Sequence, residues 1–238
     1  MKRLHWLATA AGTMVACMAA EAAAPSLDGV WTLAKPQRLL TPADRAPIPF
    51  TEKGRTLYEK HNAQVAKGDY SFDMTMSRCS SPGVPRAMLL PGPFRLFQRP
   101  DMVLATFQWN HLSRQINLHQ GPPLVTSTEP DPEGLLQTKM GNATGRWEGN
   151  TLVVQTVNLT EEKLLDDLLP NSEQLEVTER FQLRGNMLED RITIKDPEYY
   201  TRSWDVVLTY KKLPDSDFPF AEDTCLDRRA AGKPALPR

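Results

Sequence analysis

Two arms of alternating side chains, joined by a short turn, make up residues 175–195 (LEVTERFQLRGNMLEDRITIK). Apolar residues recur at every second position of each arm, and Gly185-Asn186 between the arms suits a two-residue turn. A strict period of two is typical of half-buried antiparallel strands. The stretch therefore predicts a β-hairpin whose apolar face must be buried. This face comprises Leu175, Val177, Glu179, Phe181, Leu183, Leu188, Asp190, Ile192 and Ile194.

Two acidic residues, Glu179 and Asp190, interrupt that apolar face. With a two-residue turn, Phe181 pairs with Asp190, and Glu179 is the diagonal neighbour of Asp190, about 7 Å away. Carboxylates that point into a core are costly unless they are paired or solvated. These two residues are therefore the first candidates for a functional site, although a register shift of one residue would turn either of them outward.

The first 22 residues have the pattern of a secretory signal peptide. A basic start, Lys2-Arg3, precedes an apolar stretch, and Ala20-Glu21-Ala22 is a cleavage motif of small residues. We expect cleavage after Ala22, because cleavage after Ala24 would leave a proline first. This pattern predicts a periplasmic or secreted protein with no integral membrane segment after cleavage.

A lipoprotein signal is the alternative interpretation of this segment. Met14-Val15-Ala16-Cys17 loosely matches such a signal, with Cys17 as the lipidated residue, although methionine is a poor match at its first position. In either case Cys79 and Cys225 remain, and an even pair in an oxidising compartment predicts one disulfide. It would close a loop of about 145 residues and contribute about 2–4 kcal/mol. Two free thiols are the alternative.

The length and charge of the chain limit the classes of function. About 215 residues remain after cleavage, which is enough for one large β domain. The net charge of −1 and the lack of a basic patch make nucleic acid an unexpected partner. We expect residues 23–92 to supply a strand, a helix and a Pro-rich loop packed on a barrel, 93–213 to form the barrel as a β-meander, and 214–238 to be a tail.

Strand and turn signals elsewhere in the chain support this division. A helix is expected from its cap at Thr51 to about Lys67, followed by a loop over 69–92, and a short helix is expected over 163–165. About nine strands, nearly all joined as sequential hairpins, favour closure into an antiparallel up-and-down, lipocalin-like β-barrel. A two-sheet sandwich is the second choice. The expected strands are 27–33, 94–98, 102–109, 113–119, 145–148, 151–159, the two hairpin arms and 204–210.

The same inward and outward alternation, applied to the other expected strands, places more polar and aromatic side chains in the interior. Arg114 and Thr156 face inward with Glu179 and Asp190, and they are surrounded by Trp109, Trp147, Trp204 and Tyr210. Such a set could be a structural ion pair, could orient a ligand in a barrel, or could perform acid–base catalysis. His119 and His111, at strand ends, could supply a base. No metal site or cofactor is expected, because no histidine has a ligand partner at helix or hairpin spacing.

Five segments resemble motifs of a largely uncharacterised family of exported bacterial proteins. They are LDGVW, CSSPGVPRAMLLPGPF, MGNATGRWEGNTLVVQTVNL, NSEQLEVTERF and ITIKDPEYYTRSW. The family patterns are close to C-x-P-x-G-x-P-R-x-M, G-H-S-x-G-R-W-E-G-D-T-L-V-V, H-S-x-x-L-x-V-x-E-R-F and T-I-x-D-P-x-x-Y-T-x-P-W. The resemblance covers most of residues 27–225, and it implies export and a shared β fold rather than an activity.

The chain departs from these patterns at several positions. Asn142 and Asn171 stand where the family has His, Asn150 stands where it has Asp, and residues 119–123 replace a D-G-R-x-H-P-like turn. If those family residues bind metal or transfer protons, this chain has lost them. The matching residues are Glu179, Arg180, Asp196, Pro197, Tyr200 and Thr201.

Two functions follow from these observations. The first is an exported barrel that binds a small, largely apolar molecule, aromatic ones included, in its interior. The alternative is a cofactor-independent lyase, isomerase or hydrolase that acts on a hydrophobic small molecule, with Glu179, Asp190 and His119 in acid–base roles. A third interpretation, an envelope interaction module, would require an exposed apolar patch.

Overall fold

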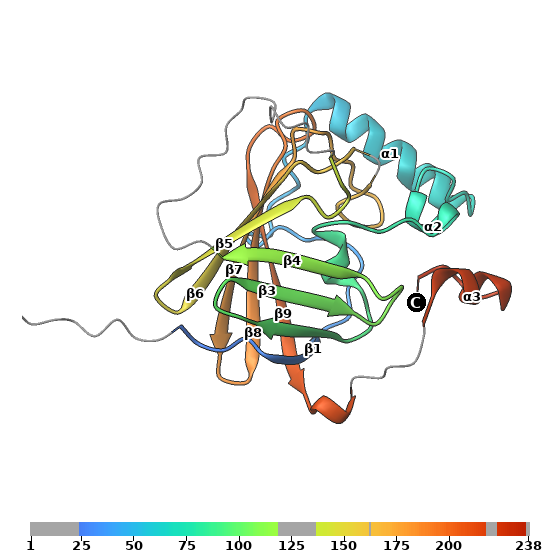
Figure 1. The fold of residues 1–238 in the computed structure, drawn as a ribbon. Coiled ribbons are helices and arrows are strands. Elements are labelled where there is room, and N and C mark those ends of the chain that lie inside the picture. Colours follow the sequence, from blue (N-terminus) through green and yellow to red (C-terminus); the bar gives the residue numbers. More distant parts are fainter. Residues whose placement is uncertain (1–23, 119–136, 162, 218–222, 237–238) are drawn as a thin grey trace, which may run out of the picture.

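A closed barrel of nine strands is the main feature of the computed structural model, which describes residues 24–118, 137–161, 163–217 and 223–236 (Figure 1). The predicted barrel is confirmed, and the sandwich alternative is wrong because β1 pairs with β9. The predicted signal peptide and His119 lie outside the described residues. The strands are β1 (Gly29–Leu33), β2 (Phe94–Gln98), β3 (Met102–Phe107), β4 (Ser113–Leu118), β5 (Asn142–Glu148), β6 (Thr151–Val157), β7 (Glu176–Arg184), β8 (Met187–Lys195) and β9 (Trp204–Leu213).

The hairpin of β7 and β8 has the register that its alternation predicts. Phe181 pairs with Asp190 and Glu179 pairs with Ile192, so Glu179 and Asp190 are diagonal neighbours inside the barrel. Gly185 adopts a left-handed conformation (φ 64°), as the two-residue turn requires. The inward positions of both strands are buried, including both acids.

The junction of β4 and β5 departs from the predicted meander. These two strands are parallel and share three residue pairs, from Ile116–Ala143 to Leu118–Gly145, whereas the other neighbours in the barrel are antiparallel. Parallel pairing needs a long connection, and the chain between Leu118 and Asn142 is long enough for one. The expectation of sequential hairpins is therefore wrong at this one place.

Helices outside the barrel are more numerous than predicted. The helix α1 (Glu52–Ala66) is confirmed, with the Thr51 side chain accepting a hydrogen bond from Gly54 N. Within the expected loop over 69–92, however, α2 (Met74–Arg78) begins at an Asp73 cap, and a 3₁₀ turn, η1 (Arg86–Leu89), follows. The tail contains η2 (Asp215–Asp217) and α3 (Cys225–Ala230). Within the described residues, no helix has the length and apolar composition of a membrane span.

The loop between β6 and β7 contains no helix over 163–165, so that expectation is wrong. Leu164 instead forms an antiparallel bridge with Pro170. The Asp166 carboxylate accepts hydrogen bonds from the backbone N–H groups of Leu40, Leu168 and Leu169, at 2.8 Å each. A side chain that binds nearby backbone N–H groups stabilises a turn at the expense of a helix.

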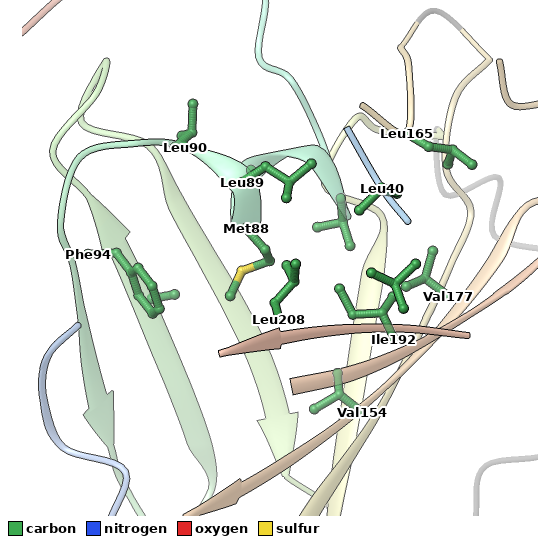
Figure 2. Packing of buried hydrophobic residues seen from close by; sticks show 14 of the residues in the cluster. Leu40, Met88, Leu89, Leu90, Phe94, Val154, Leu165, Val177, Ile192 and Leu208 are labelled. Atoms are coloured by element: carbon green, nitrogen blue, oxygen red, sulfur yellow. The ribbon is translucent and has the colours of Figure 1, made fainter. Parts of the chain in front are cut away.

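The segment around η1 closes one part of the barrel (Figure 2). Met88 points inward next to Leu208, and Leu89 lies near Leu40. All four of these side chains are buried in the common core. Trp31 on β1 is also buried, and its indole N–H donates to the Leu27 carbonyl at 3.0 Å. The core therefore extends from the barrel strands into the Pro-rich segment that precedes β2.

The predicted disulfide between Cys79 and Cys225 is confirmed, and it joins the end of α2 to the start of α3. We expect the double variant Cys79→Ser/Cys225→Ser to lower the free energy of unfolding by about 2–4 kcal/mol, because the unfolded chain regains a large loop. Urea unfolding measures this loss. Wild-type protein in a reducing agent should lose the same amount, and an unchanged midpoint in both samples would contradict the prediction.

Candidate functional site

A buried ion pair joins two strands of the barrel wall that are not neighbours, β4 and β7. Arg114 projects inward from β4, as its strand phase predicts, and donates Nη1 to Glu179 Oε1 on β7 at 2.8 Å. Its Nη2 contacts Glu179 Oε2 and also donates to Thr156 Oγ1 at 3.0 Å. The exposed fractions are 2% for Arg114 and 0% for Glu179. This fork geometry neutralises two buried charges at a fixed position in the interior.

Asp190 lies beside this pair but is not part of it. Neither of its carboxyl oxygens has a hydrogen-bond partner among the described residues, and its exposed fraction is 0%. Burial, and next the negative charge of Glu179, raise the pKa of Asp190 well above its ordinary value, although Arg114 opposes the shift. Burial therefore favours the neutral form of Asp190, whose O–H group can donate a hydrogen bond.

Tyr210 completes this group on β9. Its hydroxyl donates to the Met88 carbonyl on η1 at 3.2 Å, and its ring meets Phe94 edge-on. Burial raises the pKa of Tyr210, and the nearby Asp190 and Glu179 raise it further. We call Arg114, Thr156, Glu179, Asp190 and Tyr210 the interior polar set.

The predicted tryptophans have different positions. Trp147 is half-buried on β5, in the cross-strand row that runs through Leu152 and Phe181 to Asp190. Trp204 is buried at the start of β9 against Tyr200, and its indole nitrogen is without a hydrogen-bond partner in the described part of the chain. Trp109 donates to the Ala235 carbonyl at 2.9 Å, so its N–H group is bound to the C-terminal segment.

The histidines do not join the interior polar set in the described residues. His119 lies outside them, and His111 is exposed at the turn between β3 and β4. His61 on α1 is a packing residue, as predicted: it stacks on Phe72 with ring centroids 4.2 Å apart, and its Nδ1 lies 2.8 Å from the Leu168 carbonyl. Over the described ranges, no three His, Cys, Asp or Glu side chains cluster as metal ligands do.

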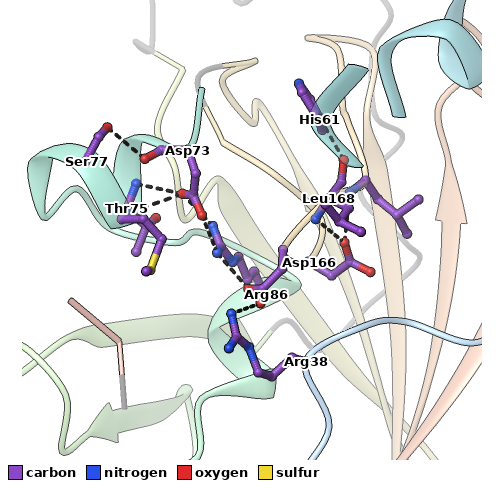
Figure 3. A network of polar contacts seen from close by, with 11 residues as sticks. Arg38, His61, Asp73, Thr75, Ser77, Arg86, Asp166 and Leu168 are labelled. Carbon is purple, nitrogen blue, oxygen red and sulfur yellow. Dashed lines mark hydrogen bonds and ion pairs between the residues drawn. The ribbon is translucent and has the colours of Figure 1, made fainter. Parts of the chain in front are cut away.

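A second buried polar network, which sequence reasoning missed, holds η1 in place (Figure 3). Arg86 is 3% exposed and donates to both oxygens of Asp73, at 2.8 and 2.6 Å, and to Asp167 at 2.8 Å. Asp167 also pairs with Arg38. Asp73 therefore caps α2 and anchors η1 with one carboxylate. Short irregular segments have no periodicity, so the sequence contained no signal for the direction of Arg86.

Comparisons with known proteins add little to this geometry. No family model matches the chain, and no curated protein matches it. Among solved structures, it is similar to a secretary abundant heat soluble (SAHS) protein from Ramazzottius varieornatus, with 9% sequence identity and a TM-score of 0.29. That similarity covers 82% of this chain and 100% of the other. A TM-score this low carries no argument, so the barrel assignment rests on the strand pairing itself.

Proposed function

We propose that this chain is an exported β-barrel protein that binds a small, largely apolar molecule in its interior. Asp190 donates a hydrogen bond to a carbonyl or hydroxyl oxygen of that ligand. The unpartnered acid among apolar side chains is the observation that carries the proposal. Ligand sites in barrels are mainly apolar, with a few polar groups that orient the ligand. The disulfide between Cys79 and Cys225 supports export, because disulfides persist in oxidising compartments.

A purely structural role explains Arg114 and Glu179 but not Asp190. The pair satisfies its own charges, whereas a buried carboxyl group with no hydrogen bond costs about 1–3 kcal/mol. An apolar residue at position 190 would avoid this cost. A residue that is unfavourable for stability in a well-packed interior is characteristic of a functional position.

Ligand entry requires a movement, because Glu179, Leu188, Asp190 and Ile192 have no exposed surface. The η1 segment is the element whose displacement opens the interior, since Met88 fills the space next to Leu208 (Figure 2). Methionine is flexible and adapts to new neighbours. The β4–β5 junction is a second route, because a hollow of about 410 Å³ there has Arg114 in its wall.

Binding of prodan, an aromatic ketone whose fluorescence depends on its surroundings, tests the proposal. We expect the mature chain to prefer prodan over the analogue with a propyl group in place of the propanoyl group by about tenfold, the value of one hydrogen bond. Asp190→Leu, which removes the donor, should abolish this preference. Asp190→Asn, which keeps an N–H donor, should retain most of it. Equal affinities of the wild type for the two probes would contradict the proposal.

An acid catalyst is the second candidate function, and the state of Asp190 favours it. A neutral carboxylic acid next to the charged Glu179–Arg114 pair matches the division of roles in enzymes that use two carboxyl groups. The reaction would be a cofactor-independent lyase, isomerase or hydrolase reaction on a hydrophobic molecule. Asp190→Asn should then abolish turnover and leave prodan binding intact, because an amide donates a hydrogen bond but cannot deliver a proton.

A further inference from the structure

Lys163, in the loop between β6 and β7, is a buried amine that the interior polar set does not include. Its exposed fraction is 5%, and its Nζ has no hydrogen-bond partner among the described residues. Lysine is almost never this buried without a partner. The same loop contains a second unsatisfied group, since the Oδ1 of Asn171 is unpartnered and Asn171 is 4% exposed.

The bridge in this loop places the two residues opposite each other. Leu164 and Pro170 pair in antiparallel fashion, so Lys163 and Asn171 are the next facing positions. Side chains at facing positions project to the same side, with Cβ atoms about 4.5–5.5 Å apart. Asn171 is held there by its Nδ2, which donates to the carbonyls of Thr160 and Ser172 at 3.0 Å each. A free donor and a free acceptor thus project from adjacent positions.

The described residues around Lys163 pack against its aliphatic stem but give its amine no hydrogen-bond partner. Its stem crosses Gly83, where an added Cβ would lie 2.4 Å from the lysine Cδ. Asp196 is already engaged by the N–H and hydroxyl groups of Ser172, at 2.7 and 2.8 Å. Burial lowers the pKa of Lys163 to about 7, with Asp196 raising it and Lys139 lowering it. About half of the amine is then uncharged at pH 7, against about 1 in 2,500 for an exposed lysine.

We propose that Lys163 and Asn171 form a second site, in which the Lys163 amine reacts with the carbonyl group of a small aldehyde or ketone. The nitrogen lone pair adds to the carbonyl carbon as the carbon–oxygen π bond opens, and the oxygen takes up a proton that the nitrogen releases, which gives a carbinolamine. The hydroxyl group of this intermediate donates a hydrogen bond to Asn171 Oδ1. Loss of that hydroxyl together with the remaining proton of the nitrogen, as water, leaves an imine. Desolvated lysines that form imines are an established class of nucleophile.

Reductive trapping on the folded mature chain tests this site. We propose incubation at pH 7 with propanal or benzaldehyde and sodium cyanoborohydride, which reduces an imine to a stable secondary amine, followed by peptide mapping. Lys60 and Lys67, both exposed at or near α1, are the internal references. We expect Lys163 to be modified at least tenfold faster than either of them. Equal or slower modification of Lys163 would overturn the proposal.

Three controls separate the site from general lysine reactivity. The preference for Lys163 should disappear in denaturant, because the fold creates it, and its persistence there would overturn the proposal. The Lys163 rate should level off above about pH 7, as its pKa requires, while the rate of free Nα-acetyllysine continues to rise. Asn171→Ala should slow Lys163 several-fold with the Lys60 rate unchanged, and an unchanged Lys163 rate would contradict the role of Asn171.

Discussion

Glu179→Gln is expected to lower the free energy of unfolding by about 3–5 kcal/mol, because it removes the charged partner that binds both nitrogens of the Arg114 guanidinium inside the barrel. Arg114 donates to both oxygens of Glu179, and glutamine can accept from one nitrogen but carries no charge. Urea unfolding at pH 7 measures the loss. A matched control is Glu176→Gln on the same strand, since Glu176 makes an exposed pair with Lys195 and should lose less than about 1 kcal/mol.

The effects of changing Glu179 and the neighbouring Asp190 on stability should not be additive. In Glu179→Gln, an ionised Asp190 offsets part of the lost negative charge, since Arg114 already acts on it electrostatically. The double variant Glu179→Gln/Asp190→Asn removes both acids from the interior. We therefore expect the double variant to be less stable than the sum of the two single changes predicts. Simple additivity would show that Asp190 and Arg114 do not interact.

Asp190→Asn is expected to change how stability depends on pH. The pKa of Asp190 is higher in the folded protein than in the unfolded chain, so the folded state retains a proton that the unfolded state releases. The free energy of unfolding of the wild type therefore falls as pH rises from the ordinary aspartate pKa toward the folded value, by about 1.4 kcal/mol per pH unit. The amide that replaces the acid does not titrate, so the variant lacks this decrease.

Unfolding curves of both proteins between pH 3.5 and pH 8 check this prediction. The gap in stability should widen in favour of the variant as pH rises above the ordinary aspartate pKa, because only the wild type loses stability there. As pH falls below the ordinary aspartate pKa of about 3.9, the gap should level off, because the acid becomes protonated in both states. Other buried groups with shifted pKa values, such as Asp166, are common to both proteins and cancel in the difference. Parallel curves over the whole range would contradict the neutral acid.

The fold could be predicted wherever a regular repeat covered a whole element. Alternation and a two-residue turn were enough for the register of β7 and β8, and hence for the diagonal placement of Glu179 and Asp190. The inward direction of Arg114 could also be predicted, by extending the alternation of β3 through the short loop that precedes β4. The parallel β4–β5 pair was not predictable in this way, because its register depends on a long connection without a pattern.

The interactions within the site were harder to predict than its residues. Alternation shows that a side chain points inward, but not which atoms it meets. It therefore could not show that Glu179 binds Arg114 whereas Asp190 has no partner in the described part of the chain. The buried position of Lys163 was not predicted either. The leucines next to it suggested a short helix, whereas the side chain of Asp166 binds backbone N–H groups and stabilises a turn.

The pairing of β1 with β9 has a consequence for biogenesis. The strand β1 cannot pair with β9 until residues 210–213 have been synthesised, since Leu33 pairs with Tyr210 and Val30 with Leu213. During synthesis β1 can therefore pair with β2, but its other edge stays unpaired until β9 has been synthesised. Contacts this distant in sequence make folding slow and leave intermediates prone to aggregation. Until β9 is available, the unpaired edge of β1 is therefore open to pairing with another chain.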